Sequence, residues 1–549
     1  MCGTQRLPRL VGLSKALEMI LMSKLIKSEE AHGLGLIDAI VPSNELINTA
    51  CCWALDIAES RKPWIKTLDR VDKIESIEEA RELLNFSRVQ ARKRAPNLEH
   101  PLICIDVIEE GIVFGPRAGL WKEANAFYQL IYSDTCKSLI HVFFSQRATS
   151  KVPGITDLSL MPRNITKVAI IGGGVIGSEI ATTLIVRNYV VILKEANENL
   201  LRAGIDRVKA NLQSYNRKGK ITEEKCKKAF SLITGVLDYE SFKDIDMVIE
   251  AVTENMASKQ QIFAELEKYC PPHCILASNT STIYFNLIGE KTRCQDRIIG
   301  ANFFSLVIYI SPIHFMPLLE IARTQETSPQ VVVDLLDIGK KIRKKTPIVV
   351  GNCTGFTLNW MFFSWIQSAL LLVDRGFDVY RIDEVCTNFS MTTGPFRLAD
   401  LVGLEAAVSI SMQYHKSFPE RCYKSLLIGI MLYDHREGET TRKGFYGYDE
   451  KKKAWPDPEL KKLIEKSRNL LGISPSPEIM KLEDKDIVEM VLFPAVNEAC
   501  RILSEGVAVK ASDLDISSIM GMGFPPYREP ENDAYVRKND VVRISGNRE

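Results

Sequence analysis

The sequence predicts a multidomain protein with one α/β domain built on a parallel sheet, helices before it and helical domains after it. Three observations support this prediction. A β-branched run, TKVAIIGGG, enters a glycine cluster at residues 166–174. Further strand-like runs alternate with helical segments, which is typical of a parallel sheet covered by helices on both faces. From residue 356 onward the pattern is helical throughout.

Length and composition limit the classes of protein. A chain of 549 residues is too long for one hydrophobic core, and about three or four domains of roughly 150 residues are expected. The 70 basic and 69 acidic residues nearly balance, so no charge bias favours a nucleic-acid or membrane partner. The 13 cysteines are odd in number and scattered, which indicates reduced thiols and not a disulfide framework.

Two local patterns are assigned structural roles only. The apolar run MFFSWIQSALLLV, residues 361–373, is shorter than the ~18 residues of a membrane span and contains Gln367, so we expect a buried helix. The sequence CPPHC, residues 270–274, lacks a second pair of ligands for zinc. We therefore expect a turn before a strand there, and no metal site.

The first 165 residues are helical in pattern. Residues 115–144 place apolar side chains at helical spacing, which predicts one long helix with a buried face. The basic cluster ARKRAP, residues 91–96, predicts a helix end stopped by Pro96. We assign no function to this cluster.

A glycine motif follows the first predicted strand. Gly172, Gly174 and Gly177 form the arrangement G-x-G-x-x-G at the start of a predicted helix, and further strands are expected at 189–193, 247–252 and 274–279. In a Rossmann-type domain the first glycine permits the tight turn, the second lets a pyrophosphate approach, and the third lets helix and strand pack closely. The motif therefore predicts a dinucleotide site.

The end of the second predicted strand favours NAD as the cofactor. Glu195 lies 18 residues after Gly177, where a carboxylate can accept hydrogen bonds from a ribose and would repel a 2′-phosphate. GGGVIGSEIA also resembles the NAD-binding half of pyridine-nucleotide disulfide reductases. Those enzymes need a preceding FAD domain with a redox cysteine pair, and residues 1–165 contain neither, so this alternative is disfavoured.

An ordered series of motifs carries a resemblance to a known family. The motifs are VIEAVTEN (248–255), ASNTSTI (277–283), IIGANFFS (298–305), MPLLEI (316–321), GNCTGFTLN (351–359) and GPFRLADLVG (394–403). Together they resemble 3-hydroxyacyl-CoA dehydrogenase. With GTQRLPRLVGLSKALEMIL and HGLGLIDAIV near the start of the chain, residues 3–528 resemble the multifunctional proteins of plant peroxisomal β-oxidation, which join an enoyl-CoA hydratase to that dehydrogenase.

The resemblance implies a reaction and several site residues. A hydride passes from C3 of a 3-hydroxyacyl-CoA thioester to NAD while a histidine, oriented by a glutamate, accepts the hydroxyl proton. Glu254 and Lys259 are expected beside the nicotinamide half of NAD. Ser281 and Asn359 are expected at the substrate oxygen or the reacting centre.

The chain departs from the family at the proton acceptor. Gly300 to Phe304 align with the family pattern G-x-H-F-F, so Asn302 stands where the catalytic histidine is expected, and an amide cannot accept the proton. The partner glutamate is present as Glu320, but about six extra residues at 306–311 leave open whether the two positions still meet. His314 matches a different family position, and if 314–320 were extended it would lie about 20 Å from Glu320. We therefore expect impaired dehydrogenation.

The resemblance also implies a domain order and a location. The expected segments are a C-terminal part of the crotonase-like hydratase domain (1–60), a helical linker (61–165), the NAD-binding domain (166–348), a dehydrogenase helical domain (349–450), a second, truncated helical repeat (480–528) and a disordered tail (529–549). The hydratase active site is expected to precede residue 3 and to be missing, which would leave apolar helix faces exposed. A peroxisomal location is implied although no C-terminal peroxisomal signal is present.

The sequence leaves several points open. A catalytically inert NAD- or acyl-CoA-binding protein is the alternative to an impaired dehydrogenase. The oligomeric state, the preferred acyl chain length and the origin of the two ends and of the extra residues at 306–311 are not indicated by any pattern in the sequence.

Overall fold

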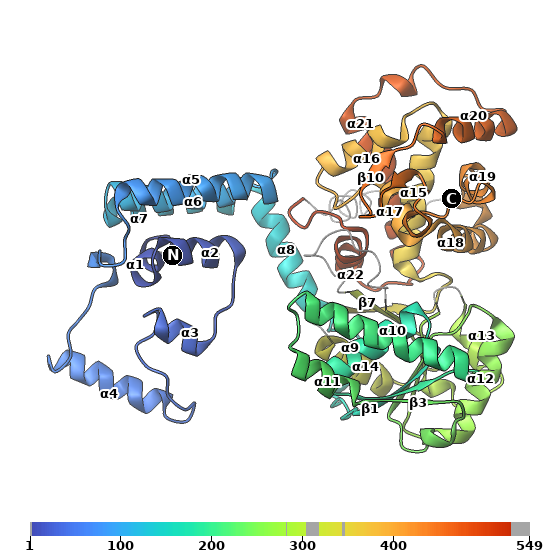
Figure 1. The fold of residues 1–549 in the computed structure, drawn as a ribbon, viewed down its shortest axis with the longest axis horizontal. Helices are drawn as coiled ribbons and strands as arrows, with labels where there is room; N and C mark the ends of the chain where they lie inside the picture. Colours follow the sequence, from blue (N-terminus) through green and yellow to red (C-terminus); the bar gives the residue numbers. More distant parts are fainter. Residues whose placement is uncertain (1–2, 281–282, 304–317, 343–345, 529–549) are drawn as a thin grey trace, which may run out of the picture. The chain divides into compact units, whose positions relative to one another are not determined.

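The computed structural model describes residues 3–280, 283–303, 318–342 and 346–528. The chain forms two compact units, Met1–Lys137 and Ser138–Glu549 (Figure 1). His314, Ser281, the extra residues at 306–311 and the expected tail at 529–549 lie outside the described residues.

The first unit is built from helices around a small core. The helices are α1 (Gly3–Val11), α2 (Leu13–Met22), α3 (Ser28–Gly33), α4 (Leu46–Ala58), α5 (Ile77–Arg94), α6 (His100–Val113) and α7 (Pro116–Ile131). Leu13, Leu17, Ala80, Leu84, Ile105 and Ile108 form its core. Helix α5 begins in a capping box made by Ser76 and Glu79 and ends at Arg94, before Pro96 as predicted.

The single long helix predicted over residues 115–144 is wrong. Helix α7 ends at Ile131, and α8 (Asp134–Ala148) begins two residues later. The Ser133 hydroxyl accepts a hydrogen bond from the Cys136 N–H at 3.2 Å and donates one to the Leu130 carbonyl at 2.6 Å. Serine at this position offers the backbone an alternative to helical hydrogen bonds, so it ends one helix and caps the next.

The first unit exposes apolar side chains, as the sequence led us to expect. Helix α4 has no buried residue, although Ile47, Leu46 and Leu55 are on it, and Ile47 is 75% exposed. By contrast, helix α15 (Phe356–Asp374), which is long and apolar enough to cross a membrane, belongs to the second unit and is 78% buried inside it. The structure thus confirms a buried helix at residues 361–373.

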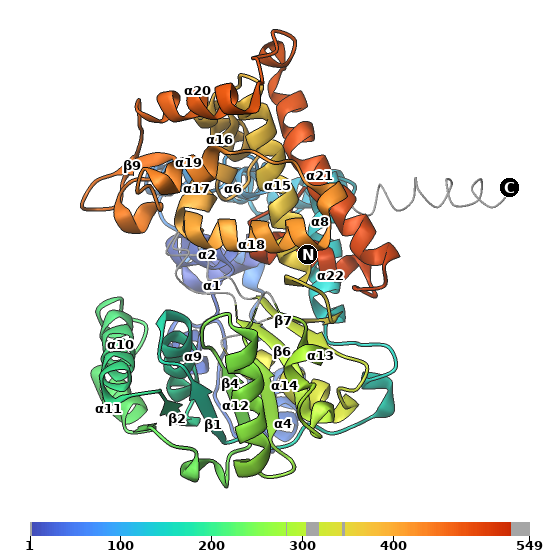
Figure 2. The ribbon, with the colours of Figure 1, turned by 90° about the vertical axis from the view of Figure 1, so that its right-hand side faces the viewer.

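The second unit contains an eight-stranded sheet in the order β3-β2-β1-β4-β5-β6-β7-β8. The strands are β1 (Lys167–Ile171), β2 (Val190–Lys194), β3 (Ile233–Val236), β4 (Met247–Glu250), β5 (Ile275–Ser278), β6 (Ile298–Phe303), β7 (Leu318–Arg323) and β8 (Thr346–Gly351). Alternate residues of β1 enter two different cores, Ala169 and Ile171 in one and Val168 and Ile170 in the other, so both faces of the sheet are covered (Figure 2).

The expectation of a wholly parallel sheet is wrong at one place. Every pair of neighbouring strands is parallel except β6 and β7, which run antiparallel. The helices around the sheet are α9 (Val175–Val186), α10 (Glu198–Arg217), α11 (Glu223–Phe230), α12 (Met256–Tyr269), α13 (Phe285–Gly289) and α14 (Pro329–Lys341). Antiparallel strands can be joined without a crossover helix, which parallel strands require.

The remainder of the second unit is mostly helical. Its helices are α15, α16 (Val379–Asn388), α17 (Pro395–Val402), α18 (Leu404–Ser417), α19 (Leu427–Tyr433), α20 (Leu460–Leu471), α21 (Asp484–Ser504) and α22 (Ala511–Ser517). A two-stranded antiparallel sheet, β9 (Tyr446–Tyr448) and β10 (Ala454–Pro456), corrects the prediction that this part is all-helical. These strands are only three residues each, too short for a periodic signal in the sequence.

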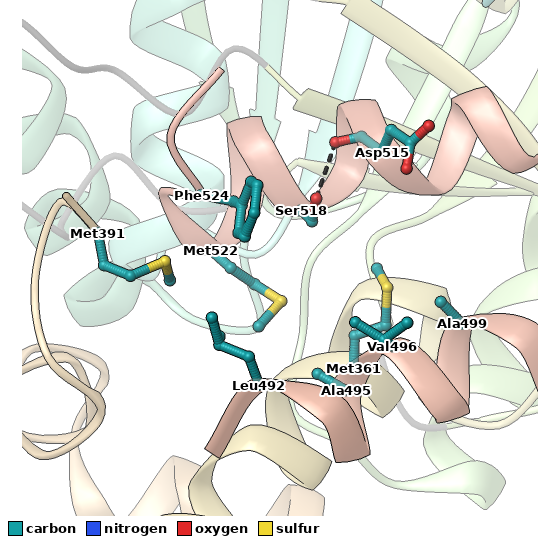
Figure 3. Close-up of a pocket in the computed structure, with 10 residues that line it drawn as sticks. All are labelled: Met361, Met391, Leu492, Ala495, Val496, Ala499, Asp515, Ser518, Met522 and Phe524. Carbon is teal, nitrogen blue, oxygen red and sulfur yellow. Dashed lines mark hydrogen bonds between the residues drawn. The ribbon is translucent and has the colours of Figure 1, made fainter. Parts of the chain in front are cut away.

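Helices α15 and α21 pack together along the centre of this helical part. Beside them lies a small, mainly apolar cavity of about 40 Å³ (Figure 3). Its lining comes from α15, α21, α22 and nearby turns: Met361, Met391, Leu492, Ala495, Val496, Ala499, Asp515, Ser518, Met522 and Phe524. None of the site residues expected from the sequence lines it.

Candidate functional site

The glycine loop between β1 and α9 has the geometry that the motif predicts. Gly172 has a φ of +100°, and a Cβ atom there would lie 2.6 Å from the carbonyl oxygen of Ala251. A Cβ at Gly177 would lie 1.9 Å from the Gly172 oxygen, whereas a Cβ at Gly174 would have no atom within 4 Å. Two glycines are therefore required by packing, and the third leaves open space before the N-terminus of α9 for a pyrophosphate.

Glu195 lies directly beside this loop at the end of β2. Its Oε1 accepts a hydrogen bond from the Gly173 N–H at 2.6 Å, and its Oε2 accepts one from the Ala196 N–H at 3.2 Å. The neighbouring Lys194 places its ammonium group 4.3 Å from the centre of the Tyr239 ring. Since Lys194 is engaged with Tyr239, the carboxylate of Glu195 is the charged group nearest the loop on this strand. This arrangement fits NAD.

A buried ion pair lies at the carboxyl end of β4. Lys259 of α12 and Glu250 of β4 are both fully buried, and Lys259 Nζ is 2.7 Å from Glu250 Oε1. Glu250 also accepts hydrogen bonds from the Ser278 hydroxyl and the Val252 N–H. Glu254 is 4.0 Å from the same ammonium group, is 40% exposed and accepts a hydrogen bond from Thr280. Glu250 and Ser278 were missed because a single carboxylate or serine at a strand end has no distinctive spacing.

Asn302 and Glu320 are brought together by the antiparallel pair of strands. Asn302 of β6 pairs in register with Glu320 of β7. Residues directly opposite in such a ladder have side chains on the same face with Cβ atoms about 5 Å apart. Their neighbours on that face, Leu318 and Ala322, belong to the core that includes α15. The two positions therefore meet, which the sequence had left open.

Glu320 is held by the N-terminus of α15. Its Oε1 accepts hydrogen bonds from the backbone N–H of Thr357 at 2.8 Å and from the Thr357 hydroxyl. Gly355 and Phe356, directly before, have φ values of +87° and +57°. A left-handed conformation at a phenylalanine costs about 1–2 kcal/mol. This turn aims the first N–H groups of α15 at the carboxylate.

The surroundings of Glu320 favour a proton on its carboxyl group. Complete burial raises the pKa of Glu320 to about 7, although the hydrogen bonds from Thr357 and the nearby backbone N–H of Leu358 favour the ionised form. Its Oε2 is buried and has no hydrogen-bond partner among the described residues. A carboxyl group with a pKa near neutrality can exchange a proton under physiological conditions.

Two further residues bear on this site. Asn359 is in the first turn of α15, two residues after Thr357, and is 8% exposed. Asn279, which the sequence analysis did not single out, accepts a hydrogen bond from the Phe303 N–H at 2.8 Å and so fixes the end of β6 next to Asn302. Thr357 and Asn279 were missed because their contacts join distant parts of the chain.

No group of three or more histidine, cysteine or acidic residues with metal-site geometry occurs in the described part of the chain. Within the CPPHC segment Cys270 and Cys274 are both buried, and β5 begins at Ile275. The hydrogen bond that the Cys274 thiol donates to Cys270 raises the pKa of Cys274, and burial raises it further. The turn before a strand is confirmed.

Family models match three parts of the chain. Residues 167–353 match the NAD binding domain of 3-hydroxyacyl-CoA dehydrogenase, and residues 355–448 match its C-terminal domain. Residues 1–83 match enoyl-CoA hydratase/isomerase. This match agrees with the prediction that the glycine loop belongs to a dehydrogenase and not to a pyridine-nucleotide disulfide reductase.

Curated relatives and a solved structure extend these matches. The glyoxysomal fatty acid β-oxidation multifunctional protein MFP-a of Cucumis sativus is 63% identical over 526 residues, which cover 96% of this chain and 72% of the relative. The peroxisomal protein MFP2 of Arabidopsis thaliana gives the same identity and coverage. The dehydrogenase part of multifunctional enzyme 1 from C. elegans superposes with a TM-score of 0.52 at 25% identity, covering 70% of this chain and 86% of that one.

Proposed function

We propose that this chain, which belongs to the fatty acid β-oxidation multifunctional proteins, oxidises 3-hydroxyacyl-CoA thioesters at a low rate. By family it is an NAD-dependent 3-hydroxyacyl-CoA dehydrogenase. The observation that carries the proposal is the pairing of Asn302 with Glu320, in the same sheet whose strand β1 leads into a glycine loop shaped for a dinucleotide. The substrate is an acyl-CoA thioester, the location is the peroxisome, and no nucleic-acid or membrane partner is proposed.

The cofactor side of the site is assigned to residues around the glycine loop. Gly172, Gly174 and Gly177 admit the pyrophosphate, and Glu195 accepts hydrogen bonds from the adenosine ribose. Glu254, which is partly exposed at the end of β4, lines the nicotinamide half. Lys259 is too deeply buried to reach solvent, so it acts by holding Glu250 and Glu254 in place.

When bound, NAD accepts the hydride from C3 of the substrate. The protein must orient the hydroxyl group and accept its proton, and Asn359 and Ser281 are the residues proposed to orient the substrate. Asn302 can donate or accept a hydrogen bond but cannot take the proton. Loss of a positioned general base lowers a rate by about 10²- to 10⁴-fold. The expected rate is lower by this factor than that of the same site with histidine at 302.

Substitution Asn302→His tests this proposal directly. We expect the rate of NADH formation from a 3-hydroxyacyl-CoA to rise by about 10²- to 10⁴-fold, with little change in NAD affinity measured by fluorescence titration. Asn469→His, at an exposed position of α20, is the control and should leave both quantities unchanged. A protein that fails to bind NAD, or an Asn302→His variant that binds NAD and stays inactive, would contradict the proposal.

A catalytically inert NAD- or acyl-CoA-binding protein is the second candidate. The replacement of the proton acceptor by Asn302 favours it. NAD binding without measurable dehydrogenation in the parent, together with recovery in Asn302→His, would select this candidate. Measurable turnover in the parent protein would select the impaired dehydrogenase.

A further inference from the structure

One oxygen of the Glu320 carboxyl group is unexplained by the fold. Oε1 accepts two hydrogen bonds from Thr357, whereas Oε2 is buried and accepts none among the described residues. Buried polar atoms in native proteins nearly always have a partner, and one without it indicates a bound water, a ligand or a catalytic role. The contacts among the described residues therefore do not explain why Oε2 is buried.

The residue opposite Glu320 is smaller than the histidine that the family resemblance leads us to expect there. Asn302 is 5% exposed and lies on the same face of the sheet, across the β6–β7 pair. Its side chain has two heavy atoms fewer than histidine, a difference in volume of about one water molecule, ~30 Å³. The amide can bind such a water through Oδ1 or Nδ2.

We propose that Glu320 is the proton acceptor of this site and receives the substrate's hydroxyl proton through one water molecule held between Oε2 and the Asn302 amide. This inference rests on the proposed function. In the step, the C3–H bond breaks and the hydride passes to oxidised NAD, while C3–O becomes a carbonyl. The hydroxyl proton goes to the water, the water passes one of its protons to Oε2, and Glu320 ends protonated.

The groups that face Glu320 support this assignment. The N–H groups of Thr357 and Leu358 stabilise the ionised carboxylate, and burial disfavours it, so the pKa of about 7 results from opposing effects. From β8 the register partner of Glu320 is Ile348, which carries no charge. Burial raises the pKa of the nearby Cys353 thiol far above neutrality, with the charge of Glu320 as a further cause, so this thiol stays neutral. Glu320 alone is expected to titrate near pH 7 here.

The test measures how the rate of NADH formation by the full chain depends on pH, with and without the Glu320 carboxylate. NADH formation from a 3-hydroxyacyl-CoA should rise through about pH 7 in the parent, where Glu320 loses its proton. In Glu320→Gln the rate should fall by about 10-fold or more and lose this rise, with NAD affinity unchanged. Glu265→Gln, at a half-buried carboxylate on α12 paired with Lys268, is the matched control and should behave as the parent.

A readout independent of turnover comes from infrared spectroscopy. The carbonyl band of buried, protonated carboxyl groups should lose intensity through about pH 7 in the parent. Because burial also raises the pKa of Asp383 to about 7, part of this loss remains in the Glu320→Gln variant, and the expected result is a smaller loss in that variant than in the parent. A thermal unfolding curve for each variant shows whether it is folded.

The outcomes separate this inference from the proposed function. A Glu320→Gln variant that keeps the parent's rate and pH profile overturns the inference. In that case the proposed function stands. A parent that shows no turnover while Asn302→His is active overturns both the inference and the low-rate oxidation, and it selects the inert binding protein. If Asn302→His is also inactive, the proposed function fails first.

Discussion

Asn302 and Glu320 face each other in register across β6 and β7, although fourteen residues, 304–317, separate the two strands in the sequence. The positions that the family resemblance assigns to the proton acceptor and its partner thus lie opposite each other, with an amide at 302. The site has the carboxylate, the amides of α15 and the dinucleotide loop, but no imidazole at 302. This combination gives predictions that separate structural from catalytic roles.

The stability of the protein should depend on the ionisation of Glu320. Its pKa is raised from 4.5 to about 7 in the folded state, so the folded protein binds more protons than the unfolded chain between these values. Stability is therefore lost as pH rises through this window, by up to about 3 kcal/mol. Glu320→Gln should be more stable than the parent at pH 8 and similar at pH 4.5, as measured by chemical denaturation. An equal difference at both pH values would contradict this reasoning.

The buried ion pair between Lys259 and Glu250 should contribute to folding. Lys259→Met leaves the Glu250 carboxylate buried without its partner, which costs about 3–5 kcal/mol. Lys268→Met, on the same helix, removes a surface pair at an exposed position and should change stability by less than about 1 kcal/mol. The measurement is the free energy of unfolding in denaturant. Equal values for the two variants would show that the pair has no structural role.

Gly174→Ala should weaken NAD binding without weakening the fold. A Cβ atom there has no protein atom within 4 Å, so the apo protein should tolerate it. It would point into the space assigned to the pyrophosphate, and we expect the NAD dissociation constant to rise by about 10-fold or more. Gly429→Ala, which also has open space around it, is the control and should leave NAD affinity unchanged. Unchanged affinity in Gly174→Ala would place the cofactor elsewhere.

Glu195 should determine the choice between NAD and NADP. Glu195→Gln removes the charge that repels a 2′-phosphate and keeps a side chain able to bind the Gly173 N–H. We expect the ratio of NADP to NAD dissociation constants to fall by about 10-fold. Glu198→Gln, an exposed acid in the first turn of α10, is the comparison. A preference that is the same in all three proteins would remove Glu195 from this role.

Much of the cofactor site could be predicted from the sequence because its signals are contiguous. A short apolar strand, three spaced glycines and a helix specify the loop within about a dozen residues, and Glu195 follows at the end of the next strand. The structure packs Gly177 against Gly172 and joins Glu195 to the same loop through the Gly173 N–H. The geometry of this loop depends on local backbone conformation, and residue type and spacing in the sequence predict local conformation.

The proton-acceptor site depends on pairings between distant segments, which no local pattern reports. The sequence identified Asn302 as the departure from the family, but it did not specify that β6 and β7 run antiparallel with 302 opposite 320. It also gave no sign that Thr357 would bind Glu320 from another domain's first helical turn, or that one carboxylate oxygen would remain buried without a donor. Strand register and burial are set by the packing of the whole sheet against α15, so only the tertiary structure decided how these residues meet.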